Sequence, residues 1–358
     1  MGRENYKALI ILLCCWFVSC KKDKPDPVIN TTPNSSGNVY IVCEGNYGAS
    51  NDATLYAYEP LLDSVFGDIY AAANNQPLGN VFQSMRRIGD KLFLCVNNSN
   101  IVAVINANNW KLSGVINIPQ PRYILPVSAT KAYVSALYHN KVYLINTQTL
   151  KVTDTITLPG FSAEVMCLYY NNVFANSWDS SSGNKIFEIN TNTNEVEHEI
   201  TVAGYAPQEA LLDKDQMLWV LAGYEPEKAG TLTRLDPSTG TILQSYYFPA
   251  AVYPLKPILN NTKDTLYFIE ANYFGSNTNN GIFRMSIYDV ALPSVPFIAA
   301  RQYQYFYALG IDPISGNIYV GDPKGFVQKG SVYIYKPDGT QVKSFTVGVG
   351  PGHFYFDD

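Results

Sequence analysis

The sequence has few charged residues and none of the motifs that commonly mark an enzyme. Asp, Glu, Lys and Arg make up 15% of the 358 residues, and the formal net charge is −5. Proteins that bind nucleic acid usually carry a basic patch, so this balance argues against nucleic acid as a partner. There is no Gly-x-Ser-x-Gly nucleophile motif, no His-Glu-x-x-His zinc motif and no phosphate-binding glycine loop. We therefore expect a protein that is not an enzyme and has no cofactor.

Cysteine is scarce after the N-terminal segment. Three of the six cysteines lie before residue 21, which leaves Cys43, Cys95 and Cys167, each inside an apolar stretch. A disulfide framework or a metal cluster would use paired cysteines at short spacing, and these three are far apart. We predict buried free thiols and no metal site.

The N-terminal segment lacks an apolar run long enough to span a bilayer. Arg3 and Lys7 precede the apolar residues 8–18, whose length is typical of a signal-peptide core. Residues 17–20 (Phe-Val-Ser-Cys) resemble a lipoprotein box, in which the cysteine becomes acylated. We interpret residues 1–19 as a lipoprotein signal peptide and residues 20–37, rich in Pro, Asn, Ser and Thr, as an acylated Cys20 with a flexible tether. The alternative is an ordinary secretory signal with an incidental cysteine.

A strand-like, aromatic-rich pattern recurs seven times over residues 38–358. Steps of 53, 40, 41, 45, 48 and 52 residues separate the equivalent positions Val39, Leu92, Ala132, Val173, Leu218, Leu266 and Ile318. Apolar and polar residues alternate within the repeats, which favours half-buried strands over helices. A period of this length made of strands is typical of a β-propeller with one four-stranded blade per repeat. The sequence therefore predicts an all-β fold, a seven-bladed β-propeller in one domain.

Two further features of the sequence predict turns within the blades and the pairing of the chain's two ends. One strand in several repeats ends in Asn or Asp (Asn106, Asn146, Asn190 and Asp236), which we interpret as turn formers and not as ligands. Residues 351–356 resemble the innermost strand of a blade, whereas the first repeat lacks such a strand before Val39. We predict that the C-terminal strand pairs with the N-terminal blade and closes the ring, because closure removes an exposed sheet edge.

Aromatic residues lie in loops that should share one face of the propeller. In an antiparallel blade, the loops after the second strands lie on the same face as the connections between blades. Loops are normally polar, so aromatic residues there predict a binding surface. The candidates are Tyr47, Trp178, Tyr224, Tyr273 and Phe274. The alternative is that these side chains fold back and cover the blades.

Alignment of the segments that begin each blade gives a second candidate set. Their third residues should form a ring at the mouth of the central channel, and all of them can form hydrogen bonds. The ring consists of Gln83, Tyr123, Glu164, Glu209, Lys256, Tyr307 and His353. A solvated channel rim without a ligand is the alternative.

The repeats carry a family resemblance. Residues 118–152 resemble the repeat of YncE-like seven-bladed propellers, and residues 346–351 resemble the segment that begins a blade in that family. Residues 44–48 (Glu-Gly-Asn-Tyr-Gly), together with the lipoprotein box, resemble propeller lipoproteins of Bacteroidetes, a group that includes BtuG-type corrinoid binders.

This resemblance implies a non-enzymatic binding protein anchored in the outer membrane, on the cell surface or on the periplasmic side. It would capture a small molecule, with a corrinoid first and a glycan next, and could pass it to an outer-membrane transporter. Two alternatives stay open. One is a Ca²⁺-dependent lactonase-like hydrolase with Glu164 and Glu209 as metal ligands, and the other is a protein-interaction scaffold.

Overall fold

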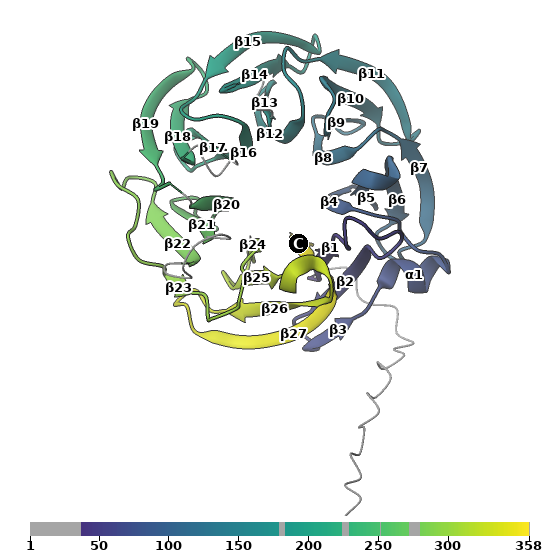
Figure 1. Ribbon diagram of the computed structural model, residues 1–358. Helices are drawn as coiled ribbons and strands as arrows, with labels where there is room; N and C mark the ends of the chain where they lie inside the picture. The colour runs from purple at the N-terminus through teal and green to yellow at the C-terminus, as the bar shows by residue number, and fades with distance from the viewer. Residues whose placement is uncertain (1–36, 179–182, 224–228, 251, 272–279, 358) are drawn as a thin grey trace, which may run out of the picture. The chain divides into compact units, whose positions relative to one another are not determined.

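The computed structural model describes residues 37–178, 183–223, 229–250, 252–271 and 280–357 (Figure 1). Within these residues the strands form seven antiparallel sheets of four strands each. The sheets are arranged as blades around a central channel, so the chain is a seven-bladed β-propeller, as predicted.

Each blade has its innermost strand at the channel and its outermost strand at the rim of the ring, and the strands follow here in that order. Blade one contains β28 (Pro351–Phe356), β1 (Val39–Cys43), β2 (Thr54–Glu59) and β3 (Ser64–Phe66). Blade two contains β4 (Phe82–Ile88), β5 (Lys91–Val96), β6 (Ile101–Asn106) and β7 (Leu112–Asn117). Blade three contains β8 (Pro121–Pro126), β9 (Lys131–Ala136), β10 (Lys141–Asn146) and β11 (Lys151–Thr157). Blade four contains β12 (Ala163–Tyr169), β13 (Asn172–Ser177), β14 (Lys185–Asn190) and β15 (Glu195–Thr201).

The remaining three blades follow the same order. Blade five contains β16 (Pro207–Leu212), β17 (Leu218–Ala222), β18 (Thr231–Asp236) and β19 (Thr241–Tyr247). Blade six contains β20 (Tyr253–Leu259), β21 (Thr265–Ala271), β22 (Gly281–Ser286) and β23 (Ile298–Ala299). Blade seven contains β24 (Ala308–Ile311), β25 (Ile318–Asp322), β26 (Lys329–Tyr335) and β27 (Gln341–Val349).

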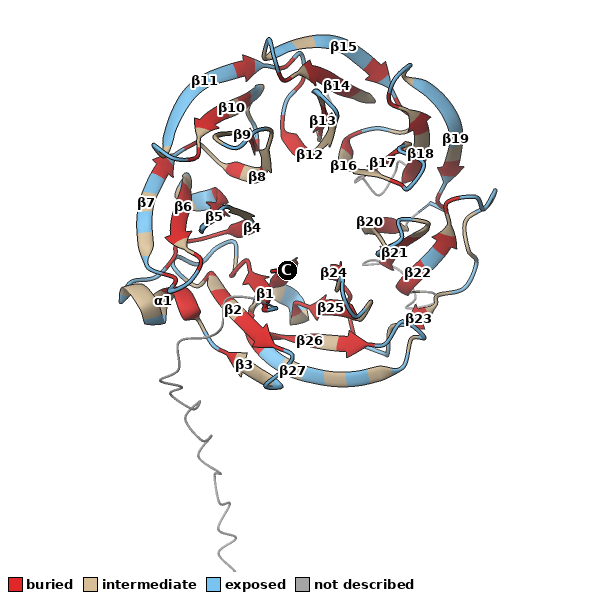
Figure 2. Ribbon diagram, turned by 180° about the vertical axis from the view of Figure 1, so that it is seen from behind, coloured by how far each residue is buried: buried red, intermediate tan, exposed pale blue. Residues whose placement is uncertain are grey.

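The core lies between neighbouring blades. Second strands such as β17 are buried along their whole length, because a blade packs against each face of the sheet. Outermost strands such as β11 and β15 are mostly exposed, as Figure 2 shows. Between blades five and six, Trp219 packs in one cluster with Phe268 and Phe283. Burial of aliphatic and aromatic side chains at such interfaces stabilises the ring.

The two ends of the described chain meet in blade one. β28 pairs with β1 in antiparallel register, with Val39 opposite Phe356 and Ile41 opposite Phe354. The Arg87 guanidinium donates to the Asp357 carboxylate at 2.6 Å and joins blade two to this sheet. The chain therefore has the strand pairing at its ends that the sequence predicts.

A short helix is an exception to a repeat made only of strands. α1 (Ile69–Asn74) lies between β3 and β4, and the Asp68 carboxylate accepts a hydrogen bond from the backbone N–H of Ala71 at its N-terminus. This insertion accounts for the long first step of the repeat. Two single turns, η1 (Asn97–Ser99) and η2 (Lys324–Phe326), are 3₁₀ helices. In the described residues, no helix is long and apolar enough to cross a membrane.

The two faces of the propeller differ in their loops. One face, called the turn face here, carries the tight turns between third and fourth strands. There Asn146 accepts from the backbone N–H of Gln148 at 3.0 Å and Asp236 accepts from that of Ser238 at 2.8 Å. The interpretation of these residues as turn formers is therefore confirmed. The opposite face, called the loop face, carries the loops after the second strands and the connections between blades.

The three cysteines of the propeller are free thiols. Cys43 and Cys95 are buried, as predicted, whereas Cys167 is only half-buried. Burial raises the pKa of all three thiols to about 12. Such thiols stay protonated and are poor nucleophiles. Residues 1–36, with the predicted signal peptide and Cys20, lie outside the described residues.

Candidate ligand-binding site

The channel opens on the loop face into a cavity of about 660 Å³. All seven blades contribute to its lining, through the beginnings of innermost strands and through loops after second strands. Cavities of this size are typical of small-molecule sites.

Most of the predicted site residues that can be placed line this cavity. They are Gln83, Tyr123, Glu164, Glu209, Lys256 and Tyr307 from the predicted ring, and Tyr47 and Trp178 from the loops. The other three predicted loop residues, Tyr224, Tyr273 and Phe274, lie outside the described residues.

His353 is the exception, because it does not reach the mouth of the channel. It lines a second cavity farther along the innermost strands. Blade one presents Glu44 at the mouth instead, and Gly352 makes room for it: a Cβ on Gly352 would meet the Glu44 carboxyl group. The strand register shifts between Val42 and Cys43 opposite this point. The prediction that His353 belongs to the mouth ring was therefore wrong.

Arg122 is a central side chain of the site that the predicted ring did not include. Its Nε donates to Glu164 Oε1 at 2.8 Å, and its Nη1 donates to Gln83 Oε1. The guanidinium also lies 5.8 Å from the centroid of the Trp178 ring. It thus links blades two, three and four and orients an aromatic residue of the loop face.

A bulge brings both Arg122 and Tyr123 to the channel. In β8 the register shifts between Pro121 and Ile124, so two consecutive side chains line the cavity. The same irregularity between Pro207 and Glu209 places Gln208 beside Glu209. In a regular strand consecutive side chains point to opposite faces, so only one of two consecutive residues in each blade would line the cavity.

Three carboxyl groups face the cavity, and burial raises the pKa of each. The pKa of Glu164 is raised by burial, although Arg122 opposes the rise. The same holds for Glu44, where Lys256 and Arg122 oppose it. Glu209 shows the largest effect: burial raises its pKa to about 7, against the attraction of Lys256 and with the help of Glu164. A substantial fraction of Glu209 is therefore protonated at neutral pH.

Lys256 stays charged in this setting. Burial disfavours its ammonium group, but Tyr123, Glu209 and Glu44 outweigh that penalty and raise its pKa. Its Nζ lies 5.8 Å from the centroid of the Tyr307 ring. The Lys256 backbone has φ = 51°, in the left-handed region that non-glycine residues rarely adopt.

Lys256 and Glu209 differ from the neighbouring polar side chains in their hydrogen bonding. Neither side chain forms a hydrogen bond or an ion pair with the residues that the structure describes. By contrast, Arg122 is bonded to Glu164, and the Tyr307 hydroxyl donates to Glu44 at 3.2 Å. Lys256 and Glu209 thus have hydrogen-bonding capacity that is open to the cavity.

Aromatic side chains surround these polar groups. Tyr47 and Tyr138 are 77% and 63% exposed at the rim, and Phe326 packs edge-on against Tyr307 at 4.9 Å between ring centroids. Phe326 also lines a neighbouring cavity of about 750 Å³ that includes Tyr303 and Tyr305. The two cavities therefore meet at one aromatic side chain.

The described residues contain no group of three or more His, Cys, Asp or Glu side chains that could hold a metal ion. Of the two carboxylates considered for Ca²⁺, Glu164 is engaged by Arg122. A metal at this position would have to displace that guanidinium or share the carboxylate with it.

Comparison with solved structures shows the fold alone. The quinonprotein alcohol dehydrogenase-like protein from Bacteroides thetaiotaomicron superposes with a TM-score of 0.68 and 15% identity, over 90% of this chain and 79% of that one. A protein from Lactobacillus plantarum gives a TM-score of 0.65 and 13% identity, over 90% and 99%. A putative 6-phosphogluconolactonase from Bacteroides fragilis gives 0.63 and 11%, over 93% and 100%.

A family model gives a sharper answer than the solved structures. No curated protein matches the chain. One family model matches residues 37–357, which is the whole propeller. The chain therefore belongs to the family described as domain of unknown function DUF5074.

Proposed function

We propose that the protein is a non-enzymatic binding protein that captures a glycan in the cavity on its loop face. The observation that carries this proposal is the pair Lys256 and Glu209, which form no hydrogen bond or ion pair with the described residues and face a cavity of about 660 Å³. Both residues are half-buried, and polar groups withdrawn from solvent are normally hydrogen-bonded. A ligand rich in hydroxyl groups would supply the donors and acceptors that these two side chains lack.

The aromatic rim supports the same ligand class. Sugar rings have apolar faces that stack on aromatic side chains, while their hydroxyl groups bond to polar ones. Trp178, oriented by Arg122, and Tyr138 lie at the rim beside the polar ring. The neighbouring cavity beyond Phe326 would give a longer glycan a continuous path.

A corrinoid, which the sequence resemblance places first, fits this cavity less well. It is larger than an ordinary drug-sized ligand, and a cavity of about 660 Å³ would enclose only part of it. It would have to lie across the rim and would leave Lys256 and Glu209 far from most of its polar groups. We therefore place the glycan first and the corrinoid second.

The cellular setting of the proposal comes from the N-terminal sequence. An acylated Cys20 followed by a tether of polar residues would hold the propeller at the outer membrane, on the cell surface or on the periplasmic side. From there the protein could pass its ligand to an outer-membrane transporter. A lactonase-like hydrolase would instead bind Ca²⁺ stoichiometrically, and a protein-interaction scaffold would bind no small molecule.

Calorimetric titration of the full-length protein in detergent tests the proposal. The ligands are a panel of mono- and oligosaccharides, with cyanocobalamin and Ca²⁺ measured in parallel. We expect saturable binding of at least one glycan. Trp178→Ala should weaken it by about 5- to 150-fold, the usual effect of losing one aromatic anchor of roughly 1–3 kcal/mol. Lys256→Met should also weaken it.

Two matched variants serve as controls. Tyr170→Ala removes an aromatic side chain that is 78% exposed in the turn between β12 and β13, on the turn face. Lys151→Met removes an exposed lysine from the outermost strand β11. Both should bind the glycan as the wild type does. Binding of cyanocobalamin without any glycan, or equal affinity in Trp178→Ala and Tyr170→Ala, would contradict the proposal.

A further inference from the structure

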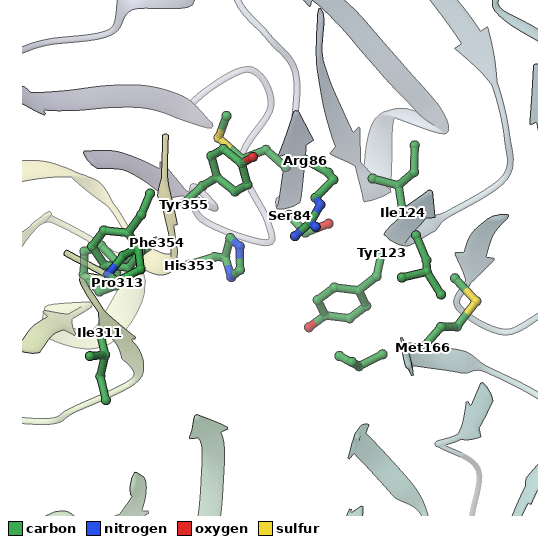
Figure 3. Close-up of a pocket in the computed structure, with 14 residues that line it drawn as sticks. Ser84, Arg86, Tyr123, Ile124, Met166, Ile311, Pro313, His353, Phe354 and Tyr355 are labelled. Carbon is green, nitrogen blue, oxygen red and sulfur yellow. The ribbon is translucent and has the colours of Figure 1, made fainter. Parts of the chain in front are cut away.

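The channel contains a second cavity of about 400 Å³, which is separate from the mouth on the loop face. Its lining comes from later positions of the innermost strands, including Arg86 of β4, Met166 of β12 and Phe354 of β28. Of the described side chains, Tyr123 alone lines both cavities. In Figure 3 the side chains of Arg86, His353 and Tyr123 point into the same open space.

The charge that lines this second cavity is positive. Among the described residues, Arg86 is its one charged lining residue and no carboxylate lines it. Arg86 forms no hydrogen bond or ion pair with the described part of the chain. The next residue, Arg87, lies on the other side of the strand and is bonded to Asp357 at 2.6 Å. Two adjacent arginines thus differ, since one has a carboxylate partner in the protein and the other has none.

His353 faces the same space and is also unbonded within the described residues. Burial, together with the positive charges of Lys256 and Arg86, lowers the pKa of His353 to about 3. The neighbouring groups that could titrate are the Tyr123 and Tyr355 hydroxyls, whose pKa values are raised by burial, while Asp357 is held by Arg87. At neutral pH the His353 ring is therefore uncharged, and it can donate one hydrogen bond from its N–H.

The rest of the lining is largely apolar. Ile311, Pro313 and Phe354 lie on one side of the space in Figure 3, and Ile124 and Met166 lie on the other. Ser84 is the remaining small polar side chain, and its hydroxyl already donates to the Arg122 carbonyl at 2.6 Å. The cavity thus combines one cation without a bonded partner and the neutral ring of His353 with Tyr123, Tyr355 and otherwise largely apolar walls.

We propose that this cavity binds a small organic anion with an apolar body. Its carboxylate head group would accept hydrogen bonds from Arg86 and His353, and its body would pack against Ile311 and Phe354. Arginine is well suited to a carboxylate because its planar fork of donors matches the two oxygens. The site is distinct from the proposed glycan site, and neither proposal depends on the other.

Histidine NMR on the full-length protein in detergent tests the site, because the chain contains only three His residues. The probe is benzoate, with benzamide as its uncharged counterpart and inorganic phosphate as an anion without an apolar body. His353→Asn identifies the signal of His353. We expect benzoate to shift this signal with a dissociation constant on the order of 1 mM, since a ligand of so few atoms binds weakly.

Benzoate should also change the ionisation of His353. In the free protein the ring should stay neutral between pH 5 and 8. A bound carboxylate favours the imidazolium, so His353 should begin to take up a proton toward the lower end of that range. Arg86→Gln should weaken benzoate binding at least about tenfold, whereas Arg284→Gln, an exposed arginine of β22, should leave it unchanged.

Several outcomes would overturn the proposal. They are an unmoved His353 signal at saturating benzoate, an equal response to benzamide, and equal benzoate affinity in Arg86→Gln and Arg284→Gln. An equal response to inorganic phosphate would overturn the assignment of an organic anion. Arg86 is exposed and has no bonded partner in the described protein, so the variant should fold, and its melting transition verifies that.

Discussion

Replacement of Glu209 by Gln should change how the stability of the propeller depends on pH. Burial raises the pKa of Glu209 from its ordinary value near 4.5 to about 7, so the folded protein binds this proton more tightly than the unfolded chain does. A group of this kind contributes stability that is fully present at pH values below 4.5. That stability is lost as the pH rises through 7. Glutamine has the shape of the protonated carboxyl group and cannot ionise.

The magnitude follows from the pKa difference. One pKa unit corresponds to about 1.4 kcal/mol, so the full shift of Glu209 corresponds to ~3 kcal/mol. The Glu209 side chain is only half-buried, so solvent screens part of this penalty, and we expect about half of it, ~1.5 kcal/mol. Glu209→Gln should therefore exceed the wild type's free energy of unfolding only by roughly 0.5 kcal/mol at pH 5, where the unfolded glutamate is already partly ionised, and by ~1.5 kcal/mol at pH 8.

Urea unfolding of both proteins at pH 5 and pH 8 measures this difference. The other carboxyl groups with raised pKa, among them Glu44 and Glu164, are present in both proteins and largely cancel in the comparison. Glu195→Gln, an exposed position on the outermost strand β15, is the matched control and should show the same difference at both pH values. If Glu209→Gln gains no stability between pH 5 and pH 8, or loses some, the assignment of a buried, partly protonated carboxyl group is refuted.

Two further predictions concern the ends of the chain. Cys20→Ala should release a soluble form or leave the precursor unprocessed, because the anchor is an acyl group on this cysteine; a variant that is still membrane-bound and lipid-labelled would disprove the lipoprotein interpretation. Deletion of residues 352–358 removes most of β28, exposes the edge of β1 and breaks the Arg87–Asp357 ion pair, so the protein should aggregate or lose cooperative unfolding. An unchanged melting transition would show that the last strand is dispensable for the ring.

The sequence was sufficient for the architecture because the repeat is a local property. Each blade needs strands with apolar residues at every second position and turn formers between them, and both signals lie within about 50 residues. Asn146 and Asp236 form turns where the sequence predicts them. The helix α1 was missed because six residues are too few to show a helical period.

The site was only partly predictable. The ring positions Gln83, Glu164 and Glu209 follow from an alignment of blades, since equivalent residues of repeats take equivalent places around the channel. Arg122 could not be found in this way, because a bulge in β8 turns two consecutive side chains toward the channel. A bulge leaves little trace in a sequence that lacks a glycine at that point.

The amino-acid sequence by itself determined that this chain forms seven blades, where the blades begin and most of the ring of polar side chains at the channel. Only the tertiary structure decided how those side chains share their charges and hydrogen bonds. Arg122 forms an ion pair with Glu164, and the Tyr307 hydroxyl donates a hydrogen bond to Glu44. Both contacts join different blades, so they form only when the ring is closed and the bulges are in place. The same packing leaves Lys256, Glu209 and Arg86 without partners among the described residues. Strand patterns are set by neighbours along the chain, whereas the pairing and burial of charges are set by residues that become neighbours only when the ring is complete.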